Sequence, residues 1–180
     1  MPELTPYQLA EQKIQQALQS GATELDLRSM KLTELPESIG QLKQLRKLDL
    51  GHDYRKDEKD KNQLTTLPDS LGQLTQLTEL NLSHNQLTTL PDSLALAQLT
   101  QLTKLNLSNN QLTTLPPSLG QLTQLTELNL INNQLTQLPK SIGNLINLTT
   151  LYVHSNQLTS LPEQIKKLNN LKSFFSVVQH

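Results

Sequence analysis

The sequence predicts an α/β solenoid, in which one small strand-containing unit is repeated and the units stack side by side. Leucine fills 42 of the 180 positions while aromatic residues make up only 3%, so one side chain must build most of the core. Segments of the form LxxLxL recur at spacings of 23, 32, 25, 23, 23 and 23 residues. They start at Ala22, Leu45, Leu77, Leu102, Leu125, Leu148 and Leu171. A fixed period of this length is the signature of a repeat architecture.

Composition and charge exclude several classes of function. The 15 Lys and Arg residues against 16 Asp and Glu give a formal charge of -1, which lacks the basic surface of a nucleic-acid or anionic-membrane binder. The absence of cysteine excludes disulfides, thiol catalysis and Cys-based metal sites. The N-terminal segment contains no apolar run long enough for a signal peptide or a membrane span. We therefore expect a cytoplasmic chain with no nucleic-acid or membrane partner and no cofactor.

Residues 1–21 predict an N-terminal capping helix. Thr5 is a helix N-cap, Pro6 suits the first turn, Gln8 completes a capping box, and Gly21 ends the helix. One helical stripe is apolar: Leu9, Ile14, Ala17 and Leu18. Such a helix is expected to cover the open apolar end of the first repeat. The alternative is an amphipathic helix that binds a partner.

The residue pattern within each repeat predicts one short parallel strand. Leu128 and Leu130 alternate with Glu127 and Asn129, so the leucines point inward and the polar residues outward. Pro139 then prevents a continuing helix or sheet ladder. The return limb is too short for a long helix, and we expect extended, polyproline-like or 3₁₀ structure there.

An asparagine recurs where the chain bends away from each strand. The positions are Asn62, Asn85, Asn110, Asn133 and Asn156. A buried bend leaves backbone groups without water, so stacked asparagine side chains are expected to form a structural ladder that satisfies them. Met30 holds this position in the first unit, so the ladder should begin one repeat late.

The unit LxxLxLxxNxLTxLPxxIGxL, nearly complete from Leu125 to Leu145, closely resembles the leucine-rich repeat family. The similarity is to the intracellular class with 23-residue units, found in plants and bacteria. It implies a right-handed solenoid whose parallel sheet lines a concave face, and that face usually binds a protein. On this basis residues 22–180 form six repeats and a partial seventh, and we expect them to make a single domain with the capping helix of residues 1–21.

The opening repeat, SGATELDLRSMKLTELPESIGQL, is similar to the first repeat of cyanobacterial Roc-COR (Roco) proteins. This similarity implies a bacterial source and a regulatory segment that precedes a GTPase. The chain itself contains no GxxxxGK[ST] phosphate loop.

The second repeat carries nine extra residues, 53–61, whose four acids and four bases cancel. The insert follows the strand and should therefore lie on the rim of the concave face. The composition predicts a solvated, flexible loop. The alternative is a recognition loop that carries Tyr54 and Arg55.

No constellation of residues predicts catalysis. His52 and His84 share a register position on adjacent strands and should approach within about 5 Å, but no carboxylate is clearly placed to complete a metal site. GxSxG, HExxH and phosphate-loop motifs are all missing from the sequence. We predict that the chain is not an enzyme and holds no metal.

The central outward column of the concave face changes along the solenoid from acid to amide to aromatic. Its residues are Asp26, Asp49, Asn81, Asn106, Asn129, Tyr152 and Phe175. Exposed apolar clusters usually mark interfaces, so we predict a protein-binding surface at the C-terminal end of this face. The expected contact residues are Asn129, Ile131, Tyr152, His154, Phe175 and Val177. One alternative is that a C-terminal cap or a following domain covers this end. We expect a monomer or weak self-association, and the alternative is a self-associating scaffold.

Overall fold

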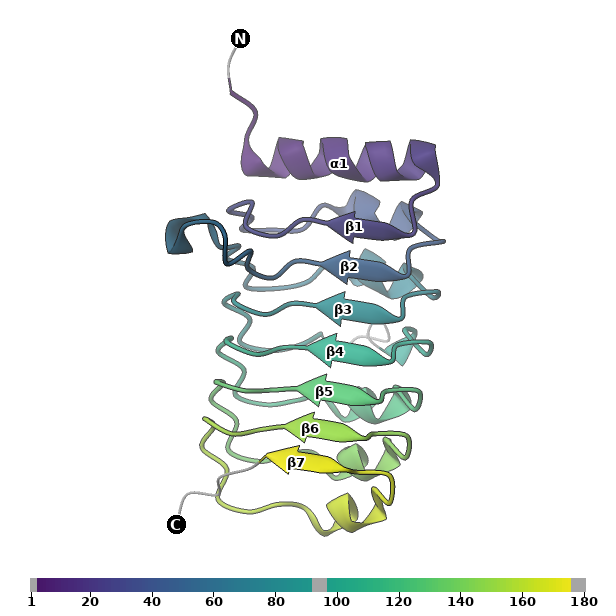
Figure 1. Ribbon diagram of the computed structural model, residues 1–180, viewed down its shortest axis with the longest axis vertical. Coiled ribbons are helices and arrows are strands. Elements are labelled where there is room, and N and C mark those ends of the chain that lie inside the picture. Colours follow the sequence, from purple (N-terminus) through teal and green to yellow (C-terminus); the bar gives the residue numbers. More distant parts are fainter. Residues whose placement is uncertain (1–2, 92–96, 176–180) are drawn as a thin grey trace.

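The predicted α/β solenoid is confirmed by the computed structural model, which describes residues 3–91 and 97–175. In the described residues seven parallel strands pair in chain order, so that each strand lies beside the next from the N-terminal helix to the last repeat (Figure 1). The strands are β1 (Glu24–Asp26), β2 (Lys47–Asp49), β3 (Glu79–Asn81), β4 (Lys104–Asn106), β5 (Glu127–Asn129), β6 (Thr150–Tyr152) and β7 (Ser173–Phe175). The helices are α1 (Pro6–Ser20) and the 3₁₀ helices η1 (Glu37–Gln41), η2 (Glu58–Asp60), η3 (Asp69–Gln73), η4 (Pro117–Gln121), η5 (Lys140–Asn144) and η6 (Glu163–Lys167).

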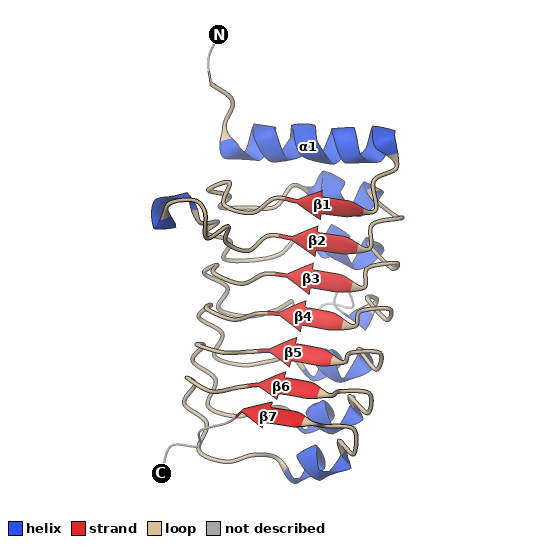
Figure 2. Cartoon of the chain, viewed as in Figure 1, coloured by secondary structure: helices blue, strands red, loops and turns tan. Residues whose placement is uncertain are grey.

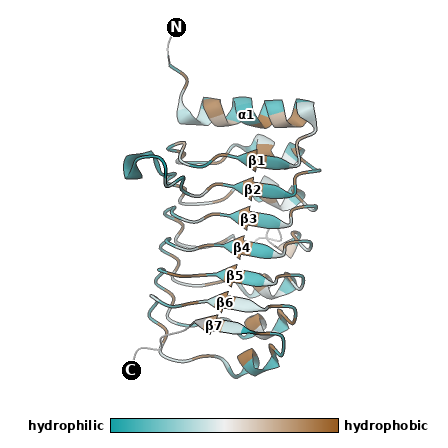
Figure 3. Cartoon of the chain, viewed as in Figure 1, coloured by the Kyte–Doolittle hydropathy of each residue, from teal (hydrophilic) through white to brown (hydrophobic). Residues whose placement is uncertain are grey.

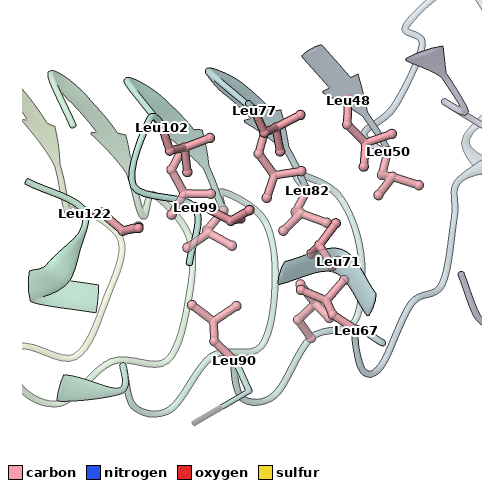
Figure 4. Packing of buried hydrophobic residues seen from close by; sticks show 14 of the residues in the cluster. Leu48, Leu50, Leu67, Leu71, Leu77, Leu82, Leu90, Leu99, Leu102 and Leu122 are labelled. Carbon is pink, nitrogen blue, oxygen red and sulfur yellow. The ribbon is translucent and has the colours of Figure 1, made fainter. Parts of the chain in front are cut away.

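The core is a continuous stack of leucines between the sheet and the return limbs (Figure 4). The middle residue of each strand points inward, in register with its neighbours, as in the pairs of Leu80 with Leu105 and of Leu105 with Leu128. These three side chains are at most 2% exposed. Burial of each one contributes about 1.5–3 kcal/mol, and no unit can bury its leucines without the next.

Apart from η2, the 3₁₀ helices lie in the return limbs, on the side of the core opposite the sheet (Figure 2), as the prolines predicted. Pro139 caps η5 in an extended conformation, and the turn then tightens into five 3₁₀ residues. Gly120 lies where the next repeat approaches most closely, and a Cβ there would lie 2.6 Å from the carbonyl oxygen of Ser141. Glycine at this position therefore allows the repeats to stack closely.

Helix α1 packs across the first repeat and begins and ends where the sequence predicts. Thr5 and Gln8 form the reciprocal capping box, and Gly21 adopts the left-handed conformation that ends the helix. The predicted apolar stripe is wrong in one member, because Leu9 is 41% exposed while Ala10 is buried. The buried residues of α1 are Ala10, Ile14 and Ala17, spaced at i, i+4 and i+7.

The recurring asparagines connect the bends of successive repeats through one chain of hydrogen bonds. Asn110 Nδ2 donates to the carbonyl oxygens of Leu82 and Leu107, 3.0 Å each, and its Oδ1 accepts from Leu87 N at 3.1 Å. The Leu82 oxygen also accepts from Asn85, and the oxygens of Leu50, Leu107 and Leu130 likewise each join two asparagines. Asn62 begins the chain of bonds and also accepts from the backbone N–H of Met30, whose own unit lacks the asparagine. All five side chains are buried.

A second ladder, of threonines, lies where the chain enters each strand. Thr103 Oγ1 donates to the carbonyl oxygen of Thr78 at 3.0 Å, and Thr126 repeats this bond to Thr103. The signal was present in the sequence as the threonine that follows the first leucine of most units. Sequence reasoning missed this signal because a threonine beside a strand usually indicates only β-propensity.

Candidate protein-binding face

The outward residues of the strands and the residues that follow them define a broad face, which we call the concave face. Three columns cross it. The first column contains Glu24, Lys47, Glu79, Lys104, Glu127, Thr150 and Ser173. The central column contains Asp26, Asp49, Asn81, Asn106, Asn129, Tyr152 and Phe175. The third column, two residues further along the chain, contains Arg28, Gly51, Ser83, Ser108, Ile131 and His154.

The first column alternates in charge. Lys47 lies 3.5 Å from Glu24 and 3.8 Å from Glu79, and Lys104 lies 3.7 Å from Glu79. Each ion pair spans two adjacent strands, so the series fixes side chains that would otherwise move independently. Exposed pairs of this kind add little stability, and their main effect is to set the pattern of charge that a partner meets.

The central column has a structural role that the sequence reasoning missed. Asn129 Oδ1 accepts from the backbone N–H of Ile131 at 3.0 Å, and Asn106 makes the same bond to Ser108. Asp26, Asp49 and Asn81 repeat this bond, which thus satisfies the N–H that follows each of the strands β1 to β5. The recurrence of Asp or Asn at one register position was the signal. Asn129, predicted as a contact residue, thus has its side-chain oxygen engaged within its own repeat.

At the N-terminal end of the face, one arginine joins two carboxylates. Arg28 donates to both oxygens of Asp26, and its Nε lies 3.6 Å from Asp49. The hydrogen bond from Arg28 lowers the pKa of Asp26, and in return the pKa of Arg28 rises. Burial raises the pKa of Asp49. This end of the face is therefore polar and internally paired.

The strands β1 to β5 line a hollow of about 500 Å³ on the concave face. Its lining carries five carboxylates and three basic groups, which leaves an excess of negative charge. The acids are Glu24, Asp26, Asp49, Glu79 and Glu127, and the bases are Arg28, Lys47 and Lys104. Glu127, on β5, is the lining residue nearest the C-terminal end of the face.

The C-terminal end of the face is less polar than the rest. In Figure 3 the strands β1 to β5 are coloured as hydrophilic, whereas β6 and β7 are nearly neutral. Tyr152, His154 and Ile131 lie near one another in register, and each is half-buried. Tyr152 is therefore only partly exposed on this face. The side chain of Phe175 and the whole of Val177 lie outside the described residues.

The insert in the second repeat is held against the solenoid. It projects beyond the ends of the strands and contains η2 (Figure 1). The Tyr54 hydroxyl lies 2.6 Å from His84 Nε2, and the Tyr54 ring packs edge-on against both His52 and His84. The backbone N–H of Lys31 also donates to the carbonyl of Asp60. Tyr54 and the histidine rings therefore connect the insert to the solenoid, whereas the flexibility of the loop stays a prediction. Tyr54 is nonetheless 76% exposed.

The two histidines approach as predicted, with ring centroids 5.7 Å apart. One nitrogen of each ring is engaged, because His52 Nδ1 lies 2.9 Å from Ser29 Oγ while His84 Nε2 bonds Tyr54 and Asn109. Among the described residues no group of three or more His, Cys, Asp and Glu side chains is arranged to hold a metal ion. We assign no catalytic chemistry to this cluster.

The contacts of His84 predict that the insert loosens in mild acid. The amide Nδ2 of Asn109 only donates, so its contact with His84 Nε2 favours the tautomer in which this nitrogen is an unprotonated acceptor. Burial lowers the pKa of His84, nearby Lys61 and His52 add to this effect, and Glu58 opposes it. A histidine whose folded-state pKa is lowered stabilises the fold above its ordinary value of 6.5, and that stability is lost as the pH falls below it. Hydrogen-exchange protection of residues 53–61 should therefore decrease between about pH 7.5 and about pH 5.

The variant His84→Gln is the control for this prediction, because glutamine accepts a hydrogen bond and does not titrate in this range. Three acids of the insert titrate lower still, since Arg55, Lys61 and Lys31 lower the pKa values of their partners Asp53, Glu58 and Asp60. An equal loss of protection in His84→Gln would show that another group is responsible.

The repeat pattern of the chain matches a family model and several solved structures. A family model described as "Leucine rich repeat" matches residues 60–112, 75–135 and 100–158, which together span more than half of the chain. A leucine-rich-repeat protein of Leptospira interrogans is 34% identical, with a TM-score of 0.52 over 92% of this chain and 58% of that one. YopM of Yersinia enterocolitica is 30% identical, with a TM-score of 0.70 over 99% of this chain and 34% of that one. The chain thus spans only part of either protein.

A plant structure is also similar. The ectodomain of the Arabidopsis thaliana receptor kinase GASSHO1/SCHENGEN3, solved in complex with CASPARIAN STRIP INTEGRITY FACTOR 2, is 31% identical, with a TM-score of 0.69 over 88% of this chain and 19% of that one. A comparison with curated protein sequences finds no significant match. In the part of the chain that the structure describes, no helix has the length and apolar character needed to cross a membrane. The strand register, the asparagine bonds and the family match lead to one conclusion: the chain belongs to the leucine-rich-repeat family.

Proposed function

We propose that the chain is a protein-interaction module that binds a protein partner through its concave face. The leucine-rich-repeat fold is commonly such a module. The observation that carries the proposal is the concave face itself, where ion-paired and amide side chains over β1 to β5 adjoin the less polar surface at Tyr152 and Ile131. A polar surface beside an aromatic anchor is the usual composition of a protein interface.

A bulky label on the concave face tests the proposal. The chain has no cysteine, so the variants Lys104→Cys and Gln121→Cys each accept one polyethylene-glycol maleimide. Position 104 lies on the concave face, and position 121 lies at the end of η4 on the opposite side. The partner is first captured by pulldown with the unmodified chain and then purified.

We expect the label at position 104 to abolish binding of the purified partner and the label at position 121 to leave it unchanged. The unlabelled Lys104→Cys variant should bind nearly as well as the original chain, because an exposed ion pair contributes little. Equal binding by both labelled proteins would place the partner elsewhere and refute the use of the concave face.

We further propose that residues 1–21 and 22–180 act as one domain. The helix α1 buries Ile14 on the first repeat, and Glu11 accepts a hydrogen bond from Ser38 at 2.7 Å. That the repeats regulate a larger Roco-type GTPase stays a prediction, tested by the reading frame beyond His180. Self-association also stays a prediction, tested by light scattering.

A further inference from the structure

The alternating charges of the first column end at Glu127, whose carboxylate forms no ion pair with its basic neighbour Lys104. Lys104, the only basic residue adjacent to Glu127 in this column, pairs with Glu79 on the other side. Among the described residues, no basic group lies within 4 Å of the Glu127 carboxylate. Glu127 is half-buried, so its charge is less screened than that of a fully exposed carboxylate.

The position next to Glu127 is small and lies beside an aromatic ring. Thr150 pairs in register with Glu127, and adjacent strands lie about 4.8 Å apart. Tyr152 lies two residues further along β6, on the same face, and pairs with Asn129. A long side chain that reaches Glu127 across Thr150 therefore passes close to the Tyr152 ring. A carboxylate beside an aromatic ring is the environment that a lysine or arginine side chain prefers.

We infer that Glu127, Thr150 and Tyr152 form a receiving site for one basic side chain, an arginine or lysine, of an extended segment of the partner protein. The charged head pairs with Glu127, the aliphatic stem lies over Thr150, and neighbouring apolar residues of the segment cover Ile131 and Tyr152. The excess of carboxylates in the adjoining hollow adds a favourable field for a basic segment. The inference rests on the proposed use of the concave face and names the chemistry of its partner.

A library of short fluorescent peptides tests the inference. The peptides are random except for one fixed position that holds Arg, Lys, Glu or Leu, and binding to the full chain is measured by fluorescence anisotropy. We expect the tightest peptides to carry Arg or Lys. Glu127→Gln, which keeps the shape and removes the charge, should weaken these peptides about tenfold. Glu127→Lys should shift the preference toward Glu.

The matched control is Glu24→Gln, which removes a carboxylate of the same column at its far end, where Lys47 pairs with it. This variant should change affinity less than about twofold. The inference would be overturned if no peptide of the library binds, or if the peptides that bind show no preference for Arg or Lys. An equal loss of peptide affinity in Glu24→Gln and Glu127→Gln would also overturn it. Peptide binding to the Lys104→Cys variant, with and without its label, separates the two proposals. If the label at position 104 abolishes peptide binding while Glu127→Gln leaves the affinity unchanged, only the basic-side-chain site is refuted. If peptides bind the labelled and the unlabelled chain equally well, the concave-face proposal itself is refuted.

Discussion

Replacing Asn110 by alanine should lower the free energy of unfolding by about 2–3 kcal/mol. The side chain is 8% exposed and provides the hydrogen-bond acceptor for the backbone N–H of Leu87. Removing it leaves that buried N–H without its partner and takes one donor from each of the Leu82 and Leu107 carbonyls. It also interrupts the bond chain at mid-solenoid. Urea unfolding followed by circular dichroism measures the change, and an unaltered m-value would show that the same surface unfolds.

The control for Asn110 is Gln111→Ala, because Gln111 is exposed and its backbone N–H donates to the Leu87 carbonyl. Within the described residues its side chain makes no hydrogen bond. We expect a change within about 0.5 kcal/mol there. Asn109 is a poor control, although it also faces outward. Its backbone is left-handed, with φ of 56°, and its side chain bonds His84 and Asn132, so alanine there should cost about 1 kcal/mol in backbone strain alone. Equal effects of Asn110→Ala and Gln111→Ala would contradict the ladder.

The regular part of the fold is predictable because every repeat poses the same physical problem. A leucine two residues from the next leucine in a strand must face the core, and the proline must end the extended limb. Stacking copies then fixes the register without further information, as the pairing of Leu80 with Leu105 illustrates. The same periodicity correctly placed the columns of the concave face.

The features that the sequence did not predict depend on contacts outside the repeat pattern. Leu9 and Ala10 differ by one position on a helix, which is a rotation of about 100°, and only the packing of α1 on the first repeat decides that Ala10 is buried. The anchoring of the insert needs Tyr54 to meet His84, thirty residues away. A composition rich in charge cannot reveal a single aromatic contact of this kind. The half-burial of Tyr152 likewise depends on the side chains around it rather than on its strand position.

The largest functional effect is expected from Tyr152→Ala. If the less polar end of the concave face anchors the partner, this change should weaken binding by at least about 2 kcal/mol, roughly thirtyfold, as is typical of a central aromatic anchor. Tyr152 is half-buried on an outward strand position, so the unfolding midpoint should fall by only a few degrees. Isothermal titration calorimetry with the purified partner measures the first quantity, and thermal unfolding measures the second.

Asp26→Ala is the matched change at the opposite end of the same central column. Asp26 is already paired with Arg28, so a partner gains little from it, and its loss should change affinity by less than about 0.5 kcal/mol. Tyr152→Phe separates the ring from the hydroxyl, and a variant that keeps the ring should keep most of the affinity. If Tyr152→Ala lowers the unfolding midpoint strongly while affinity is unchanged, the tyrosine belongs to a terminal cap. The partner would then dock elsewhere, and the exposed Tyr54 and Arg55 on the insert-bearing rim become the residues to replace next.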